Sequence, residues 1–319
     1  MKKPKILVVG SFVMDLIVTA SRFPAAGETV IGSGFTTAPG GKGANQAVQA
    51  ARLGADVTMF GKVGNDDFGR RLLESARESG VNTDAVAMSE TVPTAVGNVQ
   101  IQMSEGGTEN RIVVVPGANM DMTAEDVAAL CDKIGDFDMV ILQNEIPMAV
   151  NVAVAQSAKA KGVPVLLNPA PSAPLPKELL ASLAYIVPNE HEAQDLVGFP
   201  LNNEEDYLAA AAALRELGVE KVLITLGKQG CLYSDGQTVA HSGSVACGEV
   251  VDPTAAGDSF IGAFCRAVAA GVPVEQALTY ANCTAGITVT RMGAQTSLPT
   301  ADEVAALMDR KEIPHACFG

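Results

Sequence analysis

Residues 252–258 (DPTAAGD) combine small residues with a carboxylate at the start of a predicted helix. Small residues at 255–257 let consecutive backbone N–H groups converge at a helix N-terminus, where the helix dipole favours an anion. Asp258, on the same turn, would place beside that anion a carboxylate able to take a proton from a phosphoryl acceptor. The alternative is a helix-terminal charge among packing residues, and this segment alone supports both interpretations.

A glycine-rich segment at 40–46 (GGKGANQ) also leads into a predicted helix. Glycine permits close approach of the backbone to a ligand, while Lys42 and Asn45 offer donors to hydroxyl groups. The alternative is a flexible loop before a helix. The asparagine in an otherwise small and apolar first turn favours a binding site.

Two further segments follow predicted strands. Asn189 and Glu192 are three residues apart on one helix face, a spacing suited to hydrated Mg²⁺ and phosphate oxygens. Residues 225–230 (TLGKQG) end a strand in a glycine-bounded turn, which either holds a nucleotide or is only a β-turn.

The common nucleotide-binding signatures are missing from the sequence. Lys42 is followed by Gly43 rather than Ser or Thr, so there is no GxxxxGK[ST] motif, and no GxGxxG follows a strand. P-loop NTPases and dinucleotide-dependent dehydrogenases therefore lose their main sequence support.

Composition excludes other classes of function. With 22 Lys plus Arg against 36 Asp plus Glu, the 319-residue chain carries a net charge of −14, which disfavours binding to nucleic acid or an anionic membrane. No stretch approaches the ~20 apolar residues of a membrane-spanning helix. The six cysteines form no CxxC pair, so we expect reduced thiols in a cytoplasmic protein. They are Cys131, Cys231, Cys247, Cys265, Cys283 and Cys317.

Strands and helices alternate along most of the chain, which predicts an α/β fold with a mainly parallel sheet covered on both faces. The predicted strands are 5–10, 56–61, 139–142, 165–167, 185–187 and 221–225. The predicted helices are 43–53, 66–79, 124–133, 149–161, one from 190, 204–217, and most of 256–309. Two hairpins break the rhythm, one from strands 12–19 and 28–37, the other from 94–103 and 110–115 around residues 105–107. We expect one domain over 1–319, with a β-sheet lid formed by about 12–38 and 94–116.

Taken together and in this order, the four segments resemble the ribokinase (PfkB) family of carbohydrate kinases. Residues 40–47 (GGKGANQA) match its first signature and 252–260 (DPTAAGDSF) resemble its second, and the agreement runs from residue 10 to residue 295. The resemblance implies a Rossmann-like, doubly wound, ribokinase-like domain whose lid often forms a homodimer clasp. It also implies transfer of phosphate from ATP to the 5-hydroxyl of a pentose, with D-ribose the expected substrate and ribose 5-phosphate the product.

The resemblance also assigns roles to individual residues. Asp258 would be the base, and the backbone N–H groups of Ala255, Ala256, Gly257 and Asp258 the anion hole. The expected sugar-binding residues are Val13, Asp15, Gly41, Lys42, Gly43, Asn45, Glu145 and Asp258. The expected ATP-binding residues are Asn189, Thr225, Gly227, Gly230, Gly257 and Asn282, with Glu192 acting on Mg²⁺ through water. A monovalent cation (K⁺) would be bound, mostly through carbonyls, by Asp252, Thr254, Thr288, Arg291, Gly293 and Ser297.

One position departs from the family pattern GS-x-N-x-D, because Val13 replaces the asparagine that helps to bind ribose hydroxyls. An unpaired buried hydroxyl costs ~1–3 kcal/mol. Deoxyribokinases are similar in carrying an apolar residue there, so 2-deoxy-D-ribose is the alternative substrate. Another sugar or nucleoside kinase of the family is a further alternative. A sugar sensor without activity is disfavoured, because Asp258, Asn189, Glu192 and Lys42 are all present.

Overall fold

A nine-stranded sheet forms the centre of the molecule. The computed structural model describes residues 3–104 and 107–315. The strands of this sheet are β1 (Lys5–Val9), β4 (Asp56–Gly64), β5 (Val81–Ser89), β8 (Met139–Gln143), β9 (Val165–Asn168), β10 (Tyr185–Ile186), β11 (Lys221–Thr225), β12 (Cys231–Ser234) and β13 (Val239–Ser242). Their order is β13-β12-β11-β10-β9-β8-β1-β4-β5, parallel from β5 to β11 and antiparallel for β12 and β13.

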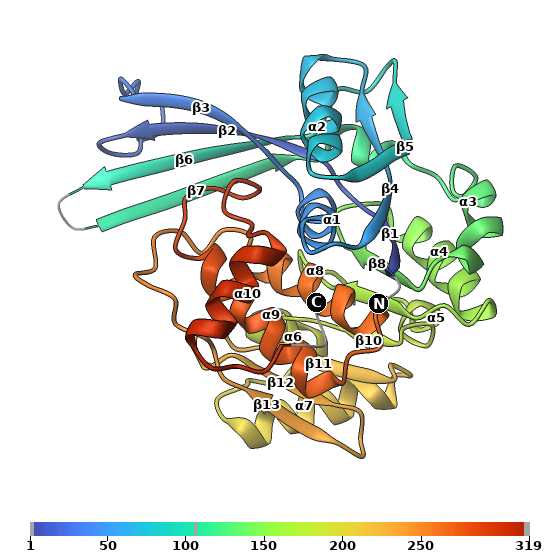
Figure 1. Ribbon diagram of the computed structural model, residues 1–319. Coiled ribbons are helices and arrows are strands. Elements are labelled where there is room, and N and C mark those ends of the chain that lie inside the picture. Colours follow the sequence, from blue (N-terminus) through green and yellow to red (C-terminus); the bar gives the residue numbers. More distant parts are fainter. Residues whose placement is uncertain (1–2, 105–106, 316–319) are drawn as a thin grey trace.

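Helices cover both faces of this sheet (Figure 1). They are α1 (Lys42–Arg52), α2 (Asp67–Glu78), α3 (Ala128–Lys133), α4 (Met148–Ala160), α5 (Lys177–Leu180), α6 (Glu190–Val197), α7 (Glu204–Glu216), α8 (Ala256–Ala269), α9 (Val274–Thr288) and α10 (Ala301–Arg310). The central strand β1 faces two cores, with Ile6 and Val8 packed on the side of α1, α2 and α8–α10, and Leu7 and Val9 on the side of α3–α7. Its continuous apolar run is therefore what a strand buried on both faces requires.

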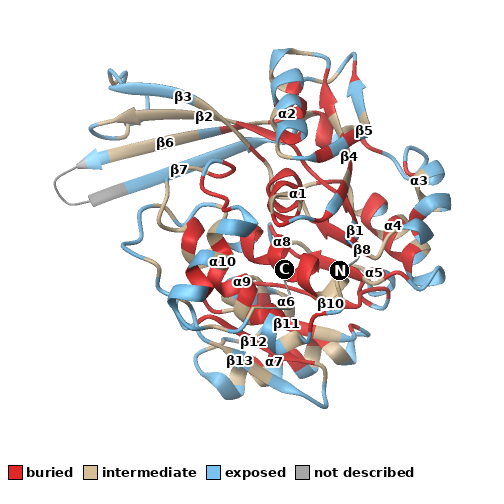
Figure 2. Cartoon of the chain, in the orientation of Figure 1, coloured by how far each residue is buried: buried red, intermediate tan, exposed pale blue. Residues whose placement is uncertain are grey.

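A second sheet of four strands extends away from the main body (Figure 1). Its strands are β2 (Val13–Ala20), β3 (Gly34–Gly40), β6 (Val96–Ser104) and β7 (Gly107–Val115), in the order β3-β2-β6-β7. Four successive apolar side chains of β7, from Ile112 to Val115, are exposed, and Figure 2 shows exposed residues along this strand. The predicted fold class, a mainly parallel α/β sheet with a small separate sheet, is confirmed.

Several element boundaries differ from the sequence prediction. The strand expected over 28–37 covers Gly34–Gly40 instead, and the helix expected over 124–133 begins at Ala128. The strands β5, β12 and β13 were missed; they lie at or next to the edges of the sheet, where polar side chains interrupt the apolar pattern. Residues 105 and 106 of the second predicted turn lie outside the described residues.

The described residues contain no helix long and apolar enough to cross a membrane. Five cysteines are free thiols, namely Cys131, Cys231, Cys247, Cys265 and Cys283. Cys317 lies outside the described residues.

Candidate active site

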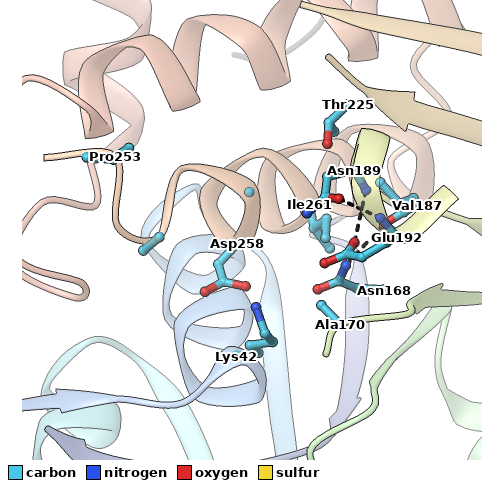
Figure 3. Close-up of a pocket in the computed structure, with 12 residues that line it drawn as sticks. Lys42, Asn168, Ala170, Val187, Asn189, Glu192, Thr225, Pro253, Asp258 and Ile261 are labelled. Atoms are coloured by element: carbon cyan, nitrogen blue, oxygen red, sulfur yellow. Dashed lines mark hydrogen bonds between the residues drawn. The ribbon is translucent and has the colours of Figure 1, made fainter. Parts of the chain in front are cut away.

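A cavity of about 230 Å³ lies where the carboxyl ends of β9, β10 and β11 meet the N-termini of α1 and α8 (Figure 3). Crevices outside the carboxyl ends of parallel strands are the usual ligand sites of open α/β sheets. Residues from all four predicted segments line this cavity: Lys42, Asn168, Ala170, Val187, Asn189, Glu192, Thr225, Pro253, Ala255, Gly257, Asp258 and Ile261.

Asp258 lies in the first turn of α8 and is only 7% exposed. Its carboxylate accepts two hydrogen bonds from α1: Asn45 donates from Nδ2 to Oδ2, and Gln46 donates from Nε2 to Oδ1, each at 2.9 Å. Two donors from one helix therefore fix a carboxylate that belongs to another. A carboxylate has about four acceptor sites, and these two hydrogen bonds leave some of them open to a ligand proton.

The turn before α8 supplies the small residues of the predicted anion site. Ala255 has a left-handed backbone (φ 60°), which brings the chain sharply into the helix. The Ala256 N–H donates to the Pro253 carbonyl at 3.2 Å, so it is not free to bind an anion as predicted. The N–H groups of Gly257 and Asp258, by contrast, have no backbone acceptor among the described residues. These two N–H groups lie at the positive end of the dipole of α8, so they can bind an anion.

The side chain of Lys42 points towards Asp258 in Figure 3. Burial lowers the pKa of Lys42, but the carboxylates of Asp258, Glu145 and Glu192 outweigh it and raise that pKa, so the amine stays charged. The Lys42 backbone N–H also donates to Glu145 at 2.9 Å, and Ser11 donates its hydroxyl to the same carboxylate. A positive charge is therefore held inside the cavity of an acidic protein.

Two glycines of the first signature serve close backbone packing. A Cβ on Gly41, whose φ is 93°, would lie 2.8 Å from the Val13 nitrogen. A Cβ on Gly43 would lie 2.5 Å from the Ser11 nitrogen. Both glycines let the start of α1 pack against residues 11–13, and this contact places Lys42 at the cavity and Asn45 against Asp258.

Asp15 lies where β2 leaves the main body, and its carboxylate fits between Gly40 and Gly97. A Cβ on Gly97 would lie 2.4 Å from Oδ1, and one on Gly40 would lie 2.7 Å from Oδ2. Burial, together with the nearby Glu145 carboxylate, raises the pKa of Asp15 to about 6. Val13 is 5% exposed and also lies beside Gly97, with Cγ1 at 3.6 Å from the same Cβ position.

Asn189 and Glu192 form a capping box at the start of α6. The Asn189 side chain accepts from the Glu192 N–H at 2.8 Å, and the Glu192 carboxylate accepts from the Asn189 N–H at 2.9 Å. Burial raises the pKa of Glu192, although the Asn189 N–H and the charge of Lys42 oppose this. A partly desolvated carboxylate gains from a nearby cation, so Glu192 fits the predicted role on Mg²⁺.

The other predicted ATP-binding residues lie at two places, the turn after β11 and helix α9. Thr225 lines the cavity, and Gly227 and Gly230 bound a short turn closed by the hydrogen bond from the Gly230 N–H to the Gly227 carbonyl, at 3.1 Å. Asn282 is buried and does not line the cavity, because its amide donates to the Ser242 carbonyl and hydroxyl at 3.1 and 3.0 Å. In this structure Asn282 holds β13 in place.

The segments predicted to bind a monovalent cation lie next to each other. Asp252 accepts from the backbone N–H groups of Thr254 and Gly293, each at 2.9 Å, which joins the loop before α8 to the loop after α9. Burial raises the pKa of Asp252, but these hydrogen bonds outweigh it and lower that pKa. A carboxylate with a lowered pKa at the junction of two loops fits a cation such as K⁺. The side chains of the other three residues bond elsewhere: Thr288 to Thr284, Arg291 to Glu303 and Ser297 to Ala294.

Sequence reasoning missed three residues at this site. Gln46 touches Asp258, Asn168 lines the cavity, and Gly97 makes room for Asp15. Gln46 stands next to Asn45 in the first signature, so its polarity on a buried helix face was the available signal. Gly97 lies in a strand separated from Asp15 by 82 residues, and no local pattern marks it.

The assembled groups suit phosphoryl transfer to a hydroxyl. Asp258 can accept the hydroxyl proton, while the N-terminus of α8 and the Lys42 amine can stabilise the charge on a transferring phosphoryl group. The described residues contain no cluster of three or more His, Cys, Asp or Glu arranged to hold a metal.

Comparison with known proteins gives one consistent result. The family model described as pfkB family carbohydrate kinase matches residues 3–301. Ribokinase of Bacillus subtilis (strain 168) is 44% identical over 303 residues, covering 95% of this chain and 99% of that protein. Ribokinase of Lactococcus lactis is 38% identical over 310 residues, covering 97% and 98%. The structure of Arabidopsis thaliana ribokinase complexed with ribose and ATP aligns with a TM-score of 0.90 at 34% identity, covering 96% of this chain and 99% of that one.

Proposed function

The chain belongs to the pfkB family of carbohydrate kinases, and on that premise we propose that it transfers the γ-phosphoryl group of ATP to the 5-hydroxyl of D-ribose. One observation carries the proposal. Asp258 is fixed by two amides at the N-terminus of α8, inside a cavity that also holds the Lys42 amine. Relatives named ribokinase, one of them solved with ribose and ATP, support the choice of sugar.

In the proposed reaction, Asp258 takes the proton from the sugar 5-hydroxyl as its oxygen bonds to the γ-phosphorus. The bond from that phosphorus to the β-phosphate oxygen breaks, and ADP leaves. The N–H groups of Gly257 and Asp258, together with Lys42, stabilise the negative charge. Mg²⁺ would neutralise phosphate charge when bound, with Glu192 holding it through water.

The two substrates would bind at different parts of the site. Asp15 lies on β2, Asn45 contacts Asp258 and Glu145 contacts Lys42, and these three would bind the sugar hydroxyls. Asn189, Thr225 and the turn from Gly227 to Gly230 lie along the strand ends and would bind ATP. We place Asn282 behind this nucleotide site as support.

The test is a coupled assay for ADP release with ribose, run on the wild type and on Asp258→Asn. We expect the wild type to turn over and the variant to lose about 10²- to 10⁴-fold in kcat, which is the usual contribution of a general base. Ribose binding, measured by calorimetry, should survive in the variant. A variant with undiminished turnover would show that Asp258 is not the base.

Val13 favours a second candidate substrate, 2-deoxy-D-ribose. The valine is buried on the same face of β2 as Asp15, so a sugar hydroxyl placed beside it would lack a partner. We propose to compare kcat/KM for both sugars in the wild type and in Val13→Asn. A large preference of the wild type for ribose eliminates this candidate, whereas a preference for deoxyribose that Val13→Asn reverses establishes it.

We also propose that the four-stranded sheet is a lid on the single domain and joins two copies in a homodimer. Ile112 and Val114 lie on one face of β7 and Val113 and Val115 on the other, and all four are about half exposed or more. Exposed apolar strands of this length usually mark an interface. Light scattering should show a dimer for the wild type and a monomer for the double variant Ile112→Lys/Val114→Lys. The same oligomeric state for both proteins would contradict the proposal.

K⁺ and a cytoplasmic location complete the proposal. The carboxylate of Asp252, which joins the loop before α8 to the loop after α9, supports a monovalent cation site, so replacing K⁺ by tetramethylammonium should lower activity. Unchanged activity would contradict this site.

We also propose a cytoplasmic location. ATP and reduced thiols are both typical of the cytoplasm, which supports that location.

A further inference from the structure

We propose that Gln46 is a positioning residue, whose side-chain amide fixes the orientation of the Asp258 carboxylate through a chain of amides anchored in the central sheet. This inference rests on the proposed role of Asp258 as base. Gln46 lies on α1 and is 0% exposed. It belongs to the first signature, and its buried side chain contacts the base.

The hydrogen bonds of Gln46 use both ends of its amide. Nε2 donates to Oδ1 of Asp258 at 2.9 Å and to Oδ1 of Asn168 at 3.2 Å. Oε1 accepts from Nε2 of Gln143 at 2.7 Å. The orientation of this amide is forced, because an ionised carboxylate only accepts and must therefore face the NH₂ end of Gln46.

The far end of the chain is rigid. Gln143 is the last residue of β8, in the middle of the nine-stranded sheet, and its carbonyl accepts from Asn151 of α4 at 2.8 Å. The Gln143 amide fills the space beside Gly10, where a Cβ would lie only 2.1 Å from Oε1. Gln143 is 0% exposed, and its Nε2 donates to Gln46 while its Oε1 has no hydrogen-bond partner among the described residues, so turning the amide away from Gln46 would remove the hydrogen bond of Nε2 as well. The sheet thus fixes Gln143, Gln143 fixes Gln46, and Gln46 fixes the carboxylate.

Asn45 and Gln46 divide the two oxygens of Asp258 between them. Asn45 donates to Oδ2, and its own Oδ1 is buried with no hydrogen-bond partner among the described residues. Gln46 has both of its amide atoms engaged within the protein. In the proposed function Asn45 also binds the sugar, so its loss should disturb sugar binding, whereas loss of Gln46 should disturb only the aim of the base.

The test compares Gln46→Met with Gln49→Met. Gln49 lies on the same helix, is also 0% exposed, and donates to the Pro299 carbonyl at 2.9 Å, away from the base. The two substitutions therefore remove the same buried donor from the same helix. We expect kcat to fall about 10- to 100-fold in Gln46→Met, with the sugar KM within about twofold, because a misaligned base affects the transition state and not ground-state binding. Gln49→Met should lose stability but keep kcat.

Gln46→Glu is measured in parallel, because its carboxylate can still accept from Gln143 but cannot donate to Asp258. It should lose at least as much kcat as Gln46→Met, and it keeps the test informative if the methionine variant does not fold. A kcat near that of the wild type in the folded Gln46 variants, an equal loss in Gln49→Met, or an effect confined to KM would overturn the positioning role. A wild type that phosphorylates no sugar would instead refute the proposed function, so the two failures are distinct.

Discussion

Gly97→Ala should weaken sugar binding while leaving the fold intact. Gly97 pairs with Asp15 across β2 and β6, and its missing side chain is what leaves room for the Asp15 carboxylate. An added Cβ would lie 2.4 Å from Oδ1 of Asp15, about 1 Å closer than the shortest ordinary van der Waals contact of 3.4 Å. The carboxylate must retreat by about that distance, which a rotation of the Asp15 side chain can provide.

A displacement of about 1 Å breaks the hydrogen bond that Asp15 would make to a sugar hydroxyl. A hydrogen bond to a charged group contributes about 1.5–3 kcal/mol, so the KM for sugar should rise about 10- to 150-fold. The Asp258 base is untouched, and kcat at saturating sugar should therefore stay near that of the wild type. The free energy of unfolding should change little, because the clash is relieved by one side-chain rotation.

The assay is steady-state kinetics over a wide range of sugar concentration, with Gly34→Ala as the matched control. Gly34 lies on β3 in the same sheet, and a Cβ there would meet Thr19 at an ordinary 3.7 Å. We expect no change in the KM of that variant. An unchanged sugar KM in Gly97→Ala would refute the placement of Asp15 against the sugar, and a fall confined to kcat would do the same.

Three further predictions concern packing, pH and the divalent ion. Gly262→Ala should lower the free energy of unfolding by about 1–3 kcal/mol and also reduce kcat. An added Cβ would lie 2.8 Å from the Gln46 carbonyl and separate α8 from α1. Urea unfolding measures the first effect and steady-state kinetics the second. The pKa of Asp15 is about 6 in the folded chain against an ordinary 3.8, so its ionisation destabilises the fold above pH 6 and not below pH 4. Asp15→Asn should accordingly gain up to about 3 kcal/mol at pH 7.5 and much less at pH 4, measured by urea unfolding at both values. Glu192→Gln keeps the capping box but removes the charge, so the melting temperature should hold while the Mg²⁺ concentration for half activity rises about tenfold.

Local sequence pattern was sufficient for the elements that are buried and continuous. The apolar run of β1 and the small-residue helix α1 were both predicted, because burial on both faces leaves a strong signal. Two short strands near one edge of the sheet left no such signal in the sequence. β12 and β13 have four residues each, and β13 is partly exposed. Their pairing depends on the antiparallel contact with β11, which no local pattern carries.

The candidate site divides in the same way. Lys42, Asn45 and Asp258 lie in two motifs with recognisable composition, so they could be predicted before their contact was known. Gly97 and Gln143 contribute through steric fit to distant segments. Gly97 lacks a side chain where Asp15 lies, and Gln143 fills the space beside Gly10. Such roles follow from shape complementarity between distant segments, and the sequence contains no periodic signal for shape.

The hydrogen bond from Gln46 on α1 to Asp258 on α8 joins residues 212 positions apart. During synthesis α1 therefore leaves the ribosome well before its partner α8. At cellular rates of about 5–20 residues per second, the ribosome needs roughly 10–40 s to pass from Gln46 to Asp258. Throughout that interval α1 has an unfilled apolar face and an unsatisfied amide, because α8 and α9 supply the other half of its core. A chain terminated before α8 lacks both the base and this half of the core, so we expect it to be degraded rather than to persist as a folded, inactive competitor for substrate.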